Sequence, residues 1–300
     1  MSDASAPPAA SRGGPESAPL VSIIVPTFNS RTTLGAALDS LAAQRERSFE
    51  VIVSDGASTD GTPELARENA PALPACTVLS RPDRGVYDAI NLGIACAAGQ
   101  WVLVLGSDDR LHGPGTLQQM APWLRRAAAD VVYGDVRVMG PSRLGVAPGG
   151  RHAGEMPLHR LLRGNICQQA IFYRRNLFDR LGGFDLAYPV MADWDFNLRA
   201  AFRGPMQWVD VVVADYAATG LSAQRRDLAA MRGIPEMVRR EFVRRANDTT
   251  LWPHQRVLLR QADTLRRLGH WGDASRQLLS FAGLLWQRAA AHGLRWFRRG

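Results

Sequence analysis

The sequence predicts an α/β fold in which a parallel sheet is flanked by helices. From Pro19 onward, short apolar runs of the strand type alternate with segments of helical periodicity, which is the pattern of a parallel α/β layer. Polar residues directly follow several of the apolar runs, as expected where strand ends form a ligand crevice. The chain has 300 residues, 46% of them apolar, which is enough for one large core.

The elements of this layer follow in order along the chain. Leu34, Leu38 and Leu41 fall on one face of the first expected helix, because this spacing places side chains on the same side of an α-helix. A segment rich in glycine, proline and arginine at 140–157 predicts a loop. The expected strands are 20–25, 49–54, 77–80, 101–105, 131–136, 170–175 and 207–218, and the expected helices are 32–44, 61–70, 86–99, a short one ending in LGGFD (181–185), and 193–202.

Composition divides the chain into three parts. Residues 1–18 are rich in alanine, proline, serine and glycine and lack the apolar core of a signal peptide, which predicts a disordered leader. Residues 19–224 carry the strand and helix pattern and are expected to form one domain. Residues 225–300 contain 16 arginines against 6 acidic residues, a balance of +10 that exceeds the +8 of the whole chain. This last part therefore predicts a basic helical extension.

The absence of lysine, together with the number and spacing of cysteine and histidine, excludes several kinds of chemistry. All 36 basic residues are arginine, which excludes a phosphate-binding P-loop, a Schiff base and a lysine general base. Cys76, Cys96 and Cys167 are widely spaced and odd in number, which fits free thiols in a reducing cytoplasm better than a disulfide framework. The six histidines show no metal-ligand spacing. The sequence contains no uninterrupted run of about 18 apolar residues, so it predicts no membrane-spanning helix. A cytoplasmic protein is therefore expected.

Polar residues follow the first two expected strands. Pro26 cannot continue a hydrogen-bonded central strand, and Thr27 and Asn29 offer polar groups at the crevice. From these residues alone, an ordinary loop with an asparagine helix cap is an equal alternative. Asp55 emerges directly from the second strand and can accept hydrogen bonds from a base or a ribose. Asp60, by contrast, is better explained as a helix cap.

The third and fourth strand ends carry charged side chains. Asp83 and Arg84 precede a glycine, and the helix that follows, with Asn91 on it, aims its N-terminal amides at the same crevice. Packing is the alternative role for Asn91. The adjacent carboxylates Asp108 and Asp109 end the fourth strand, and they are costly in a partly dry crevice unless a cation or a donor offsets them. A positive partner is therefore expected there, and a plain surface turn is the alternative.

Taken in order, four segments resemble the family 2 inverting glycosyltransferases of GT-A fold, and bacterial polysaccharide-assembly enzymes in particular. They are VSIIVPTFNS, VIVSDGASTDGT, RPDRGVYDAINLGIACAAGQWVLVLGSDD and MADWDFNLR, and the resemblance spans roughly two thirds of the chain, from about Leu20 to Ser222. It implies a GT-A type Rossmann-like mixed sheet flanked by helices, with the helical extension beyond it. Within 19–224 it implies a nucleotide-binding part at about 19–138 and an acceptor part at about 139–224.

The resemblance also implies which residues hold the donor, a nucleotide diphosphate sugar of the UDP or GDP type. The implied contacts are Pro26, Thr27, Asn29 and Asp55 for the nucleotide, and Asp83, Arg84 and Asn91 for the nucleotide sugar. The family's Asp-x-Asp signature, which binds a divalent cation on the diphosphate, falls on Gly106, Ser107 and Asp108, with Asp109 next. Its first acid is absent, but Mg²⁺ or Mn²⁺ still suits paired carboxylates and phosphate. This cation would be the positive partner that Asp108 and Asp109 need.

The second acidic centre, MADWDFNLR, implies the catalytic base. Asp193 aligns with the second acid of the family's Glu-Asp pair, and Ala192 stands in place of the first. An inverting transfer needs one such base, which takes the proton of the acceptor hydroxyl as its oxygen attacks the anomeric carbon. The alternative is an aspartate that only caps the helix. The other implied sugar or acceptor contacts are Gln168, Gln169, Trp194 and Asp195.

The basic extension at 225–300 has two interpretations of equal weight. Tryptophans and leucines among clustered arginines are typical of an amphipathic helix on an anionic membrane surface. The other interpretation is a solvated helical appendage packed on the core. Nucleic acid is not expected as a partner, because the positive charge lies away from the acidic motifs. Membrane binding would place the protein on the inner face of the cytoplasmic membrane.

The sequence therefore predicts a metal-dependent inverting glycosyltransferase of the hexosyltransferase type. Its acceptor would be a hydroxyl of a glycan or lipid-linked glycan, in the synthesis of bacterial cell-surface polysaccharide. A non-catalytic nucleotide-sugar-binding protein is the main alternative, because Gly106 and Ala192 stand where acids are expected. A sugar nucleotidyltransferase is a weaker alternative, since PTFNSRTTL is not the glycine-rich basic loop that such an enzyme needs.

Overall fold

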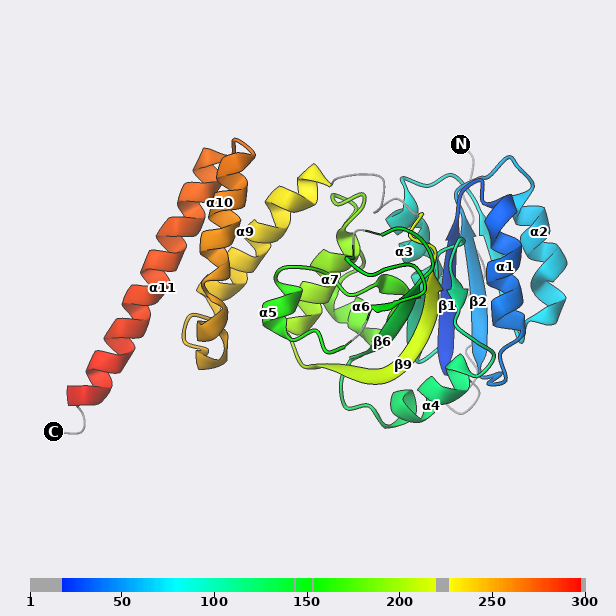
Figure 1. Cartoon of the computed structure of the whole chain (residues 1–300), viewed down its shortest axis with the longest axis horizontal. Helices are drawn as coiled ribbons and strands as arrows, with labels where there is room; N and C mark the ends of the chain where they lie inside the picture. The colour runs from blue at the N-terminus through cyan, green and yellow to red at the C-terminus, as the bar shows by residue number, and fades with distance from the viewer. Residues whose placement is uncertain (1–17, 143, 153, 220–226, 298–300) are drawn as a thin grey trace, which may run out of the picture.

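The structure is a computed structural model that describes residues 18–142, 144–152, 154–219 and 227–297, with side chains as far as 288. Figure 1 shows a rounded α/β body that contains the N-terminal part of the chain, and helices that extend from it toward the C-terminus. The leader expected at 1–18 lies outside the described residues except for its last position. The expected boundary near 224 falls within 220–226, also outside the described ranges.

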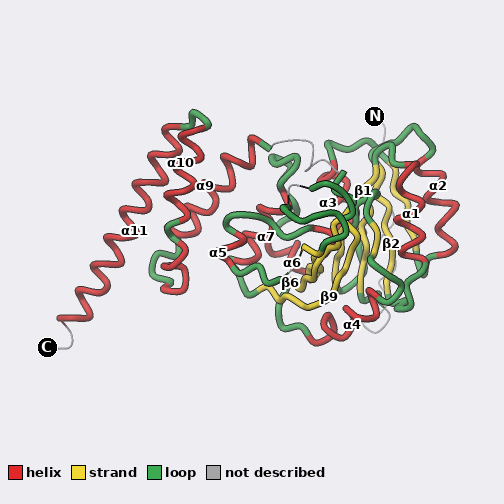
Figure 2. Tube along the Cα trace, in the orientation of Figure 1, coloured by secondary structure: helices red, strands yellow, loops and turns green. Residues whose placement is uncertain are grey.

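The described strands form one nine-stranded sheet in the order β3-β2-β1-β4-β8-β6-β9-β5, with β7 paired to β6 (Figure 2). The strands β3, β2, β1 and β4 run parallel to one another, β8 is antiparallel to both β4 and β6, and β9 is parallel to β6 and antiparallel to β5. Their bounds are β1 (Val21–Thr27), β2 (Phe49–Asp55), β3 (Cys76–Ser80), β4 (Trp101–Val104), β5 (Arg110–Leu111), β6 (Val131–Val138), β7 (Arg151–His152), β8 (Ile171–Arg174) and β9 (Met206–Tyr216). The parallel prediction thus holds up to β4, and the mixed sheet that the resemblance implies is confirmed.

Helices cover both faces of the sheet, and each face has its own hydrophobic core. Ile23 on β1 packs with α1 and α4 in one core, whereas its neighbour Ile24 packs with α3 and α7 in the other, because successive strand residues point to opposite faces. Leu34, Leu38 and Leu41 are buried on α1, as the helical spacing predicts. The helices are α1 (Arg31–Ala42), α2 (Thr62–Asn69), η1 (Ala70–Ala72), α3 (Val86–Cys96), α4 (Thr116–Arg126), α5 (Leu158–Leu161), η2 (Gln168–Ala170), α6 (Asn176–Leu181) and α7 (Ala192–Ala201).

An aromatic cluster fixes the position of α7 against the sheet. The ring centroids of Tyr173 on β8 and Phe196 on α7 lie 5.3 Å apart, and those of Phe178 on α6 and Phe196 lie 4.6 Å apart. Phe184 packs on the same group. Aromatic pairs at such distances add to the stabilisation that burial provides. The first turn of α7, which carries Asp193, is therefore held on a rigid base.

The sequence assigns no element to 110–126, where the structure contains β5 and α4. β5 is a two-residue strand, too short to show an alternating pattern. α4 contains Pro122, a residue that ordinarily indicates the end of a helix. Leu117, Met120 and Leu124 are nevertheless buried along one side of α4. Packing of this apolar side against the sheet thus outweighs the tendency of Pro122 to end a helix.

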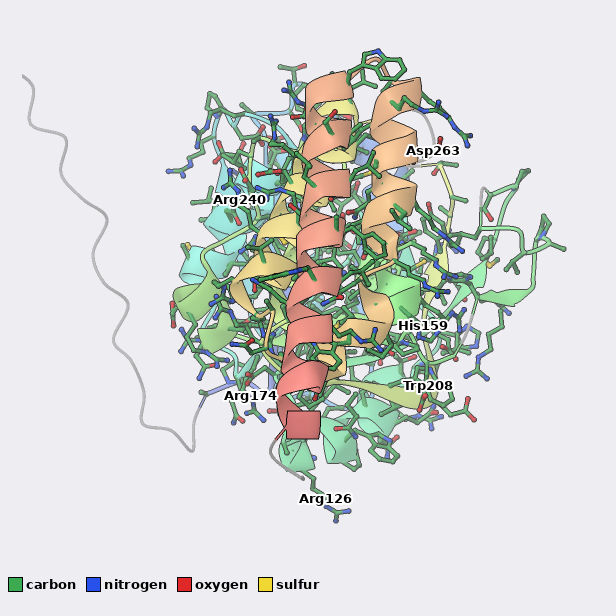
Figure 3. The ribbon with its side chains drawn as sticks, turned by 90° about the vertical axis from the view of Figure 1, so that its left-hand side faces the viewer. Arg126, His159, Arg174, Trp208, Arg240 and Asp263 are labelled. Atoms are coloured by element: carbon green, nitrogen blue, oxygen red, sulfur yellow. The ribbon has the colours of Figure 1, made fainter. Side chains whose placement is uncertain are left out.

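The helices after 227 are partly packed on the α/β body. Ile234, Val238 and Phe242 of α9 are buried in the same core as α7, and the ring centroids of Phe242 and Phe202 lie 5.8 Å apart. The outer helix α11 lies at the edge of the molecule that is turned toward the viewer in Figure 3. Among the described helices, none is long and apolar enough to cross a membrane. The helices of this extension are α9 (Leu228–Arg244), η3 (Thr249–His254), α10 (Val257–Arg267) and α11 (Trp271–Phe297).

Candidate active site at the edge of the sheet

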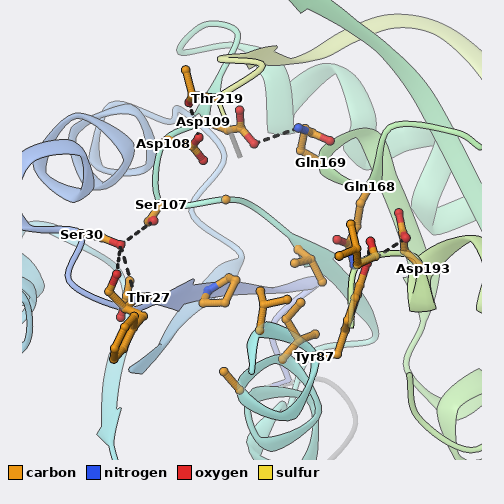
Figure 4. Close-up of a pocket in the computed structure, with 18 of the residues that line it drawn as sticks. Thr27, Ser30, Tyr87, Ser107, Asp108, Asp109, Gln168, Gln169, Asp193 and Thr219 are labelled. Carbon is orange, nitrogen blue, oxygen red and sulfur yellow. Dashed lines mark hydrogen bonds between the residues drawn. The ribbon is translucent and has the colours of Figure 1, made fainter. Parts of the chain in front are cut away.

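A cleft of about 1040 Å³ lies where β1 and β4 end and where α3 and α7 begin (Figure 4). It brings together most of the residues that the sequence predicts for the site, and in Figure 4 Asp108 and Asp109 lie on one side with Asp193 on the other. Asp55, Arg84, Asn91 and Asp195 are not among its lining residues. The predicted residues that line the cleft are Pro26, Thr27, Asn29, Asp83, Asp108, Asp109, Gln168, Gln169, Asp193 and Trp194.

The loop after β1 is joined to the loop after β2 by hydrogen bonds. Asn29 adopts a left-handed φ of 49°, a conformation that asparagine tolerates better than most residues. Its backbone N–H donates to Oγ of Ser58 at 2.7 Å, and its Oδ1 accepts from the backbone N–H of Thr59 at 3.0 Å. The two loops therefore form one wall of the cleft, and the exposed ring of Phe28 projects from it.

Asp55 lies behind this wall and stabilises it through hydrogen bonds. One of its oxygens accepts from Thr27 Oγ1 at 3.0 Å, and the other accepts from the N–H of Ser58 at 2.9 Å and from Ser80 Oγ at 2.7 Å. Burial alone would raise the pKa of Asp55, but hydrogen bonds from Ser58, Ser80 and Thr27 outweigh it and lower the pKa below its ordinary value. Asp55 is thus an ionised centre that ties β1, β2 and β3 together beside the cleft.

The residues after β3 divide between the cleft and its surroundings. Asp83 lines the cleft and accepts from the N–H of Gly85 at 2.8 Å. Arg84 instead forms an ion pair with Asp88, with 3.1 Å between Nη2 and Oδ1, and its side chain is 76% exposed. Asn91 donates to the carbonyl oxygen of Phe184 at 2.8 Å and accepts from the N–H of the same residue at 2.9 Å. In this structure, Arg84 and Asn91 therefore make structural contacts outside the cleft.

The acidic pair after β4 is held by hydrogen bonds from several segments. Asp108 accepts from Thr219 Oγ1 at 2.6 Å. Asp109 is buried and accepts from Gln169 Nε2 and from the N–H of Ala217, both at 2.8 Å. Burial, with the charge of Asp108, raises the pKa of Asp109 to about 7. Two carboxylates are thus gathered at one point of the cleft wall, as the residues at this strand end predict.

Gly106, which stands in place of the first acid of the Asp-x-Asp pattern, lies close to the carboxylates of Asp108 and Asp109. A Cβ atom there would lie 2.7 Å from Asp109 Oδ2 and 2.9 Å from Asp108 Oδ1. Asp109 cannot easily move away, because both of its oxygens are held. Gly106 therefore leaves the space that the two following carboxylates occupy.

The donor set of Asp108 and Asp109 fits a hard cation that is shared with a substrate. The described residues include no group of three or more acidic, histidine or cysteine side chains able to hold a metal ion by themselves. Mg²⁺ is commonly bound through one or two carboxylates together with substrate phosphates. Among the described residues, the lining of the cleft contains no arginine and no histidine, the side chains that could offset phosphate charge. The described lining thus offers carboxylates, but no side-chain cation, to a diphosphate.

Asp193 lies in the first turn of α7 and accepts hydrogen bonds from two side chains. Tyr87 Oη is 2.9 Å from its Oδ1, and Asn165 Nδ2 donates to its Oδ2 at 2.7 Å. Burial raises the pKa of Asp193 to about 6, although the bonds from Tyr87 and Asn165 oppose the shift. A carboxylate with a pKa near 6 is mainly ionised at neutral pH and is more basic than an ordinary aspartate.

Of the other predicted contacts, Gln168 and Trp194 line the cleft and Asp195 does not. Gln168 lines the cleft, and its Nε2 is buried without a hydrogen-bond partner among the described residues. Trp194 lines the cleft and donates through Nε1 to the carbonyl oxygen of Leu161 at 2.7 Å. Asp195 is buried and forms an ion pair with Arg199 at 2.7 Å, one helical turn further along α7. Asp195 thus faces its partner rather than the cleft.

Sequence reasoning missed some lining residues. Phe28 lies inside the first motif, so an aromatic ring between two polar cleft residues was the signal that could have identified it. Tyr87 is compatible with packing from its spacing alone, yet its hydroxyl reaches the Asp193 carboxylate. Asn165 lies in a loop between two short helices and carries no local signal. Only the tertiary structure brings Asn165 to Asp193.

Comparison with known proteins identifies the family. The family model described as Glycosyl transferase family 2 matches residues 22–182, just over half of the chain. A curated relative, the PGL/p-HBAD biosynthesis glycosyltransferase of Mycobacterium bovis (strain BCG / Pasteur 1173P2), is 42% identical over 229 residues, which cover 74% of this chain and 86% of the relative.

Solved structures confirm the GT-A fold. TarS of S. aureus, in complex with UDP, is similar with a TM-score of 0.55 at 19% identity, and the match covers 91% of each chain. The mannosyltransferase PcManGT of Pyrobaculum calidifontis, in complex with GDP-Man and Mn²⁺, is similar with a TM-score of 0.56 at 23% identity, and the match covers 91% of this chain and 80% of that one. With its sequence match, its mixed sheet and its acidic cleft, the chain belongs to glycosyl transferase family 2.

Proposed function

We propose that this glycosyltransferase transfers a hexose from a UDP- or GDP-linked sugar to an acceptor hydroxyl, with inversion and with the help of Mg²⁺ or Mn²⁺. The observation that carries the proposal is the single cleft that Asp108, Asp109 and Asp193 line together. Similar structures bind UDP-GlcNAc in one case and GDP-Man with Mn²⁺ in another, which supports a nucleotide-sugar donor and a divalent cation.

The donor lies, in this proposal, between the wall after β1 and the acidic pair after β4. Thr27, Asn29 and Asp83 contact the nucleotide, and Phe28 provides a face on which a base can stack. Asp55 acts indirectly by holding the shape of this wall. Asp108 and Asp109 hold the cation, which when bound offsets the charge of the diphosphate.

Asp193 is the general base in the proposed reaction. Its carboxylate takes the proton from the acceptor hydroxyl, and the acceptor oxygen forms a bond to the anomeric carbon from the face opposite the diphosphate. The bond between the anomeric carbon and the diphosphate oxygen breaks, and the nucleoside diphosphate leaves with the electron pair. Gln168 and Trp194 contact the sugar or the acceptor at the same end of the cleft. An inverting reaction of this type needs no carboxylate nucleophile.

The acceptor is, in this proposal, a glycan or a lipid-linked glycan of the bacterial cell surface. The name of the M. bovis relative places that protein in PGL/p-HBAD biosynthesis. The family match argues against a sugar nucleotidyltransferase. The position of the Asp193 carboxylate in the cleft, opposite the acidic pair, argues against a protein that only binds nucleotide sugars.

A screen of nucleotide sugars tests the proposed function directly. The protein is incubated with UDP- and GDP-sugars, with Mn²⁺, Mg²⁺ or EDTA, and release of nucleoside diphosphate and the melting temperature are measured. We expect at least one donor to be hydrolysed slowly and to stabilise the fold, in the presence of metal only. If no donor stabilised the fold, the nucleotide-sugar proposal would fail. Stabilisation without turnover, even with acceptor mixtures, would favour the non-catalytic alternative.

The outer face of α11 supports a membrane-bound location for the enzyme. Trp271, Leu278, Leu279, Leu285 and Trp286 are all exposed, and they recur along α11 at spacings of seven and eight residues, which form one stripe. Residues 225–300 carry a balance of +10, so the charge favours an anionic surface as the occupant of this stripe. We therefore include in the proposal that α11 lies on the inner face of the cytoplasmic membrane, while α9 packs on the body.

A vesicle assay tests the membrane proposal. Binding to vesicles that contain phosphatidylglycerol is expected to fall at least about tenfold when Trp271 and Trp286 are both changed to serine, because apolar area is lost from the stripe. Trp123→Ser is the matched control, since Trp123 is also exposed but lies on α4, and it should bind as the wild type does. Equal binding of all three proteins would rule out the stripe as the membrane contact.

A further inference from the structure

Asp193 is the end of a chain of hydrogen bonds that runs through the protein interior. Asn165 Nδ2 donates to Asp193 Oδ2 at 2.7 Å, Asn197 Nδ2 donates to Asn165 Oδ1 at 2.7 Å, and Tyr173 Oη donates to Asn197 Oδ1 at 2.8 Å. These side chains come from a loop, from α7 and from β8. We call Tyr173, Asn197 and Asn165 the relay.

The direction of the relay depends on the charge of Asp193. An ionised carboxylate accepts hydrogen bonds only, so Asn165 must present its NH₂ group to Asp193 and its oxygen to Asn197. Asn197 must then present its NH₂ group to Asn165 and its oxygen to the hydroxyl of Tyr173. The opposite orientation of both amides would place the Asn165 oxygen against the carboxylate, which is tolerable only when Asp193 carries a proton.

The two inner members of the relay are buried, so their polar groups must be satisfied within it, whereas Asn165 is partly buried and lines the cleft. Tyr173 and Asn197 are both 0% exposed. Burial raises the pKa of Tyr173 well above its ordinary value, so its hydroxyl keeps its proton and can donate it to Asn197. A buried polar group without a partner costs roughly 1–3 kcal/mol. This cost favours the one arrangement in which every member is bonded.

No arginine in the described part of the chain lies close enough to Asp193 to assist it. The titratable groups that face it are Tyr87 from α3, Tyr173 from β8 and Cys167 from its own loop, and burial raises the pKa of each, to about 12 for Cys167. All of them are therefore neutral near pH 7. Within the described ranges, Asp193 forms no ion pair with an arginine. Its negative charge is thus stabilised by hydrogen bonds from Tyr87 and Asn165 and from the backbone N–H groups at the start of α7.

We propose that Asn165, oriented by Asn197 and Tyr173, is a positioning residue that keeps the Asp193 carboxylate ionised and aimed into the cleft. The inference rests on the proposed function, since it concerns the base of that reaction. Tyr87 has a second acceptor in reach, the carbonyl oxygen of Val190 at 2.9 Å, and only one proton to give. Within the described ranges, Asn165 Nδ2 has no second acceptor of this kind, so Asn165 is the more dependable of the two side-chain donors to Asp193.

The test is the pH profile of transfer with the isosteric variant Asn165→Asp. In the wild type, with metal, donor and acceptor all saturating so that the cation keeps Asp109 ionised, kcat should rise with pH as Asp193 loses its proton. The variant removes the donor and adds an acid beside Asp193, so we expect the rising limb to move upward by about one to two pH units. Above the shifted limb, most activity should return, and the KM for the donor should stay within about twofold of wild type. A purely structural role would not move the limb.

Controls separate failure of the relay from failure of the proposed function. Asn69→Asp, on α2 and away from the cleft, should leave the profile unchanged. Tyr173→Phe removes only the hydroxyl that starts the relay, and a smaller upward shift is expected, which keeps the test valid if Asn165→Asp does not fold. An unshifted limb in both variants, or activity lost at every pH while donor binding persists, would overturn the relay. Full activity of Asp193→Asn would instead overturn the base assignment itself.

Discussion

Asp193→Asn is expected to lower the rate of sugar transfer by about 1000-fold, which is within the usual contribution of a general base. Asparagine preserves the shape of the side chain and can still bond to Tyr87 and Asn165, but it cannot take a proton from the acceptor hydroxyl. Donor binding should stay within about twofold of wild type, because the proposed sites of the cation and the nucleotide lie on the opposite wall of the cleft. The effect should therefore fall on kcat and not on the KM for the donor.

The measurement is steady-state transfer with the donor that the screen identifies, together with donor-induced change in melting temperature. Asp179→Asn is a suitable control, since Asp179 is an exposed aspartate on α6 outside the cleft, and it should behave as wild type. Retention of activity by Asp193→Asn would show that another group removes the proton. Loss of donor binding in the same variant would assign Asp193 to the donor site instead.

Asp108→Asn is expected to abolish metal-dependent donor binding and to lower kcat/KM at least about 100-fold. A metal ion that polarises a phosphoryl oxygen is worth several kcal/mol, and each 1.36 kcal/mol corresponds to a factor of ten. The described lining of the cleft has no arginine to replace this charge, and the chain has no lysine at all. The diphosphate would then face Asp109 without a neutralising partner.

Titration of the nucleoside diphosphate, followed by melting temperature with Mn²⁺ and with EDTA, checks this second prediction. The wild type should gain stability only with Mn²⁺, and Asp108→Asn should gain almost none under either condition. Without ligand, the melting temperature of the variant should remain close to that of wild type. Equal stabilisation of wild type with and without metal would contradict the cation site, whatever the variant does.

The acidic pair could be predicted from the sequence because its position follows from chain geometry. Asp108 and Asp109 come directly after an apolar strand, and the carboxyl ends of parallel strands meet at one edge. Thr27, Asn29 and Asp83 follow the same rule, and all of them line the cleft. Where one strand leads straight into one loop, the local sequence therefore places the side chain at this edge of the sheet, although Asp55 at the end of β2 lies beside the cleft and does not line it.

Residues on helices and long loops were harder to predict. Arg84 and Asn91 belong to a recognisable motif, but a motif does not distinguish a side chain that faces a ligand from one that pairs with Asp88 or with the backbone of Phe184. Asn165 reaches Asp193 only because β8 and α7 pack behind its loop. The antiparallel turn of the sheet between β4 and β8 is likewise a long-range feature, and apolar periodicity alone does not reveal strand direction.

The change from parallel to antiparallel pairing between β4 and β8 lies between the donor side of the cleft and the side that carries the proposed base. The side chains proposed to contact the nucleotide and the cation follow β1, β3 and β4, whereas the base stands on α7. Of its two side-chain supports, Asn165 lies in the loop before β8 and Tyr87 lies on α3. The two groups face each other across the cleft, and the hydrogen bonds from Tyr87 to Asp193 and from Gln169 to Asp109 join them. Chimeras that exchange the chain after residue 139 with that of a relative should consequently alter what becomes glycosylated and preserve which activated sugar is consumed.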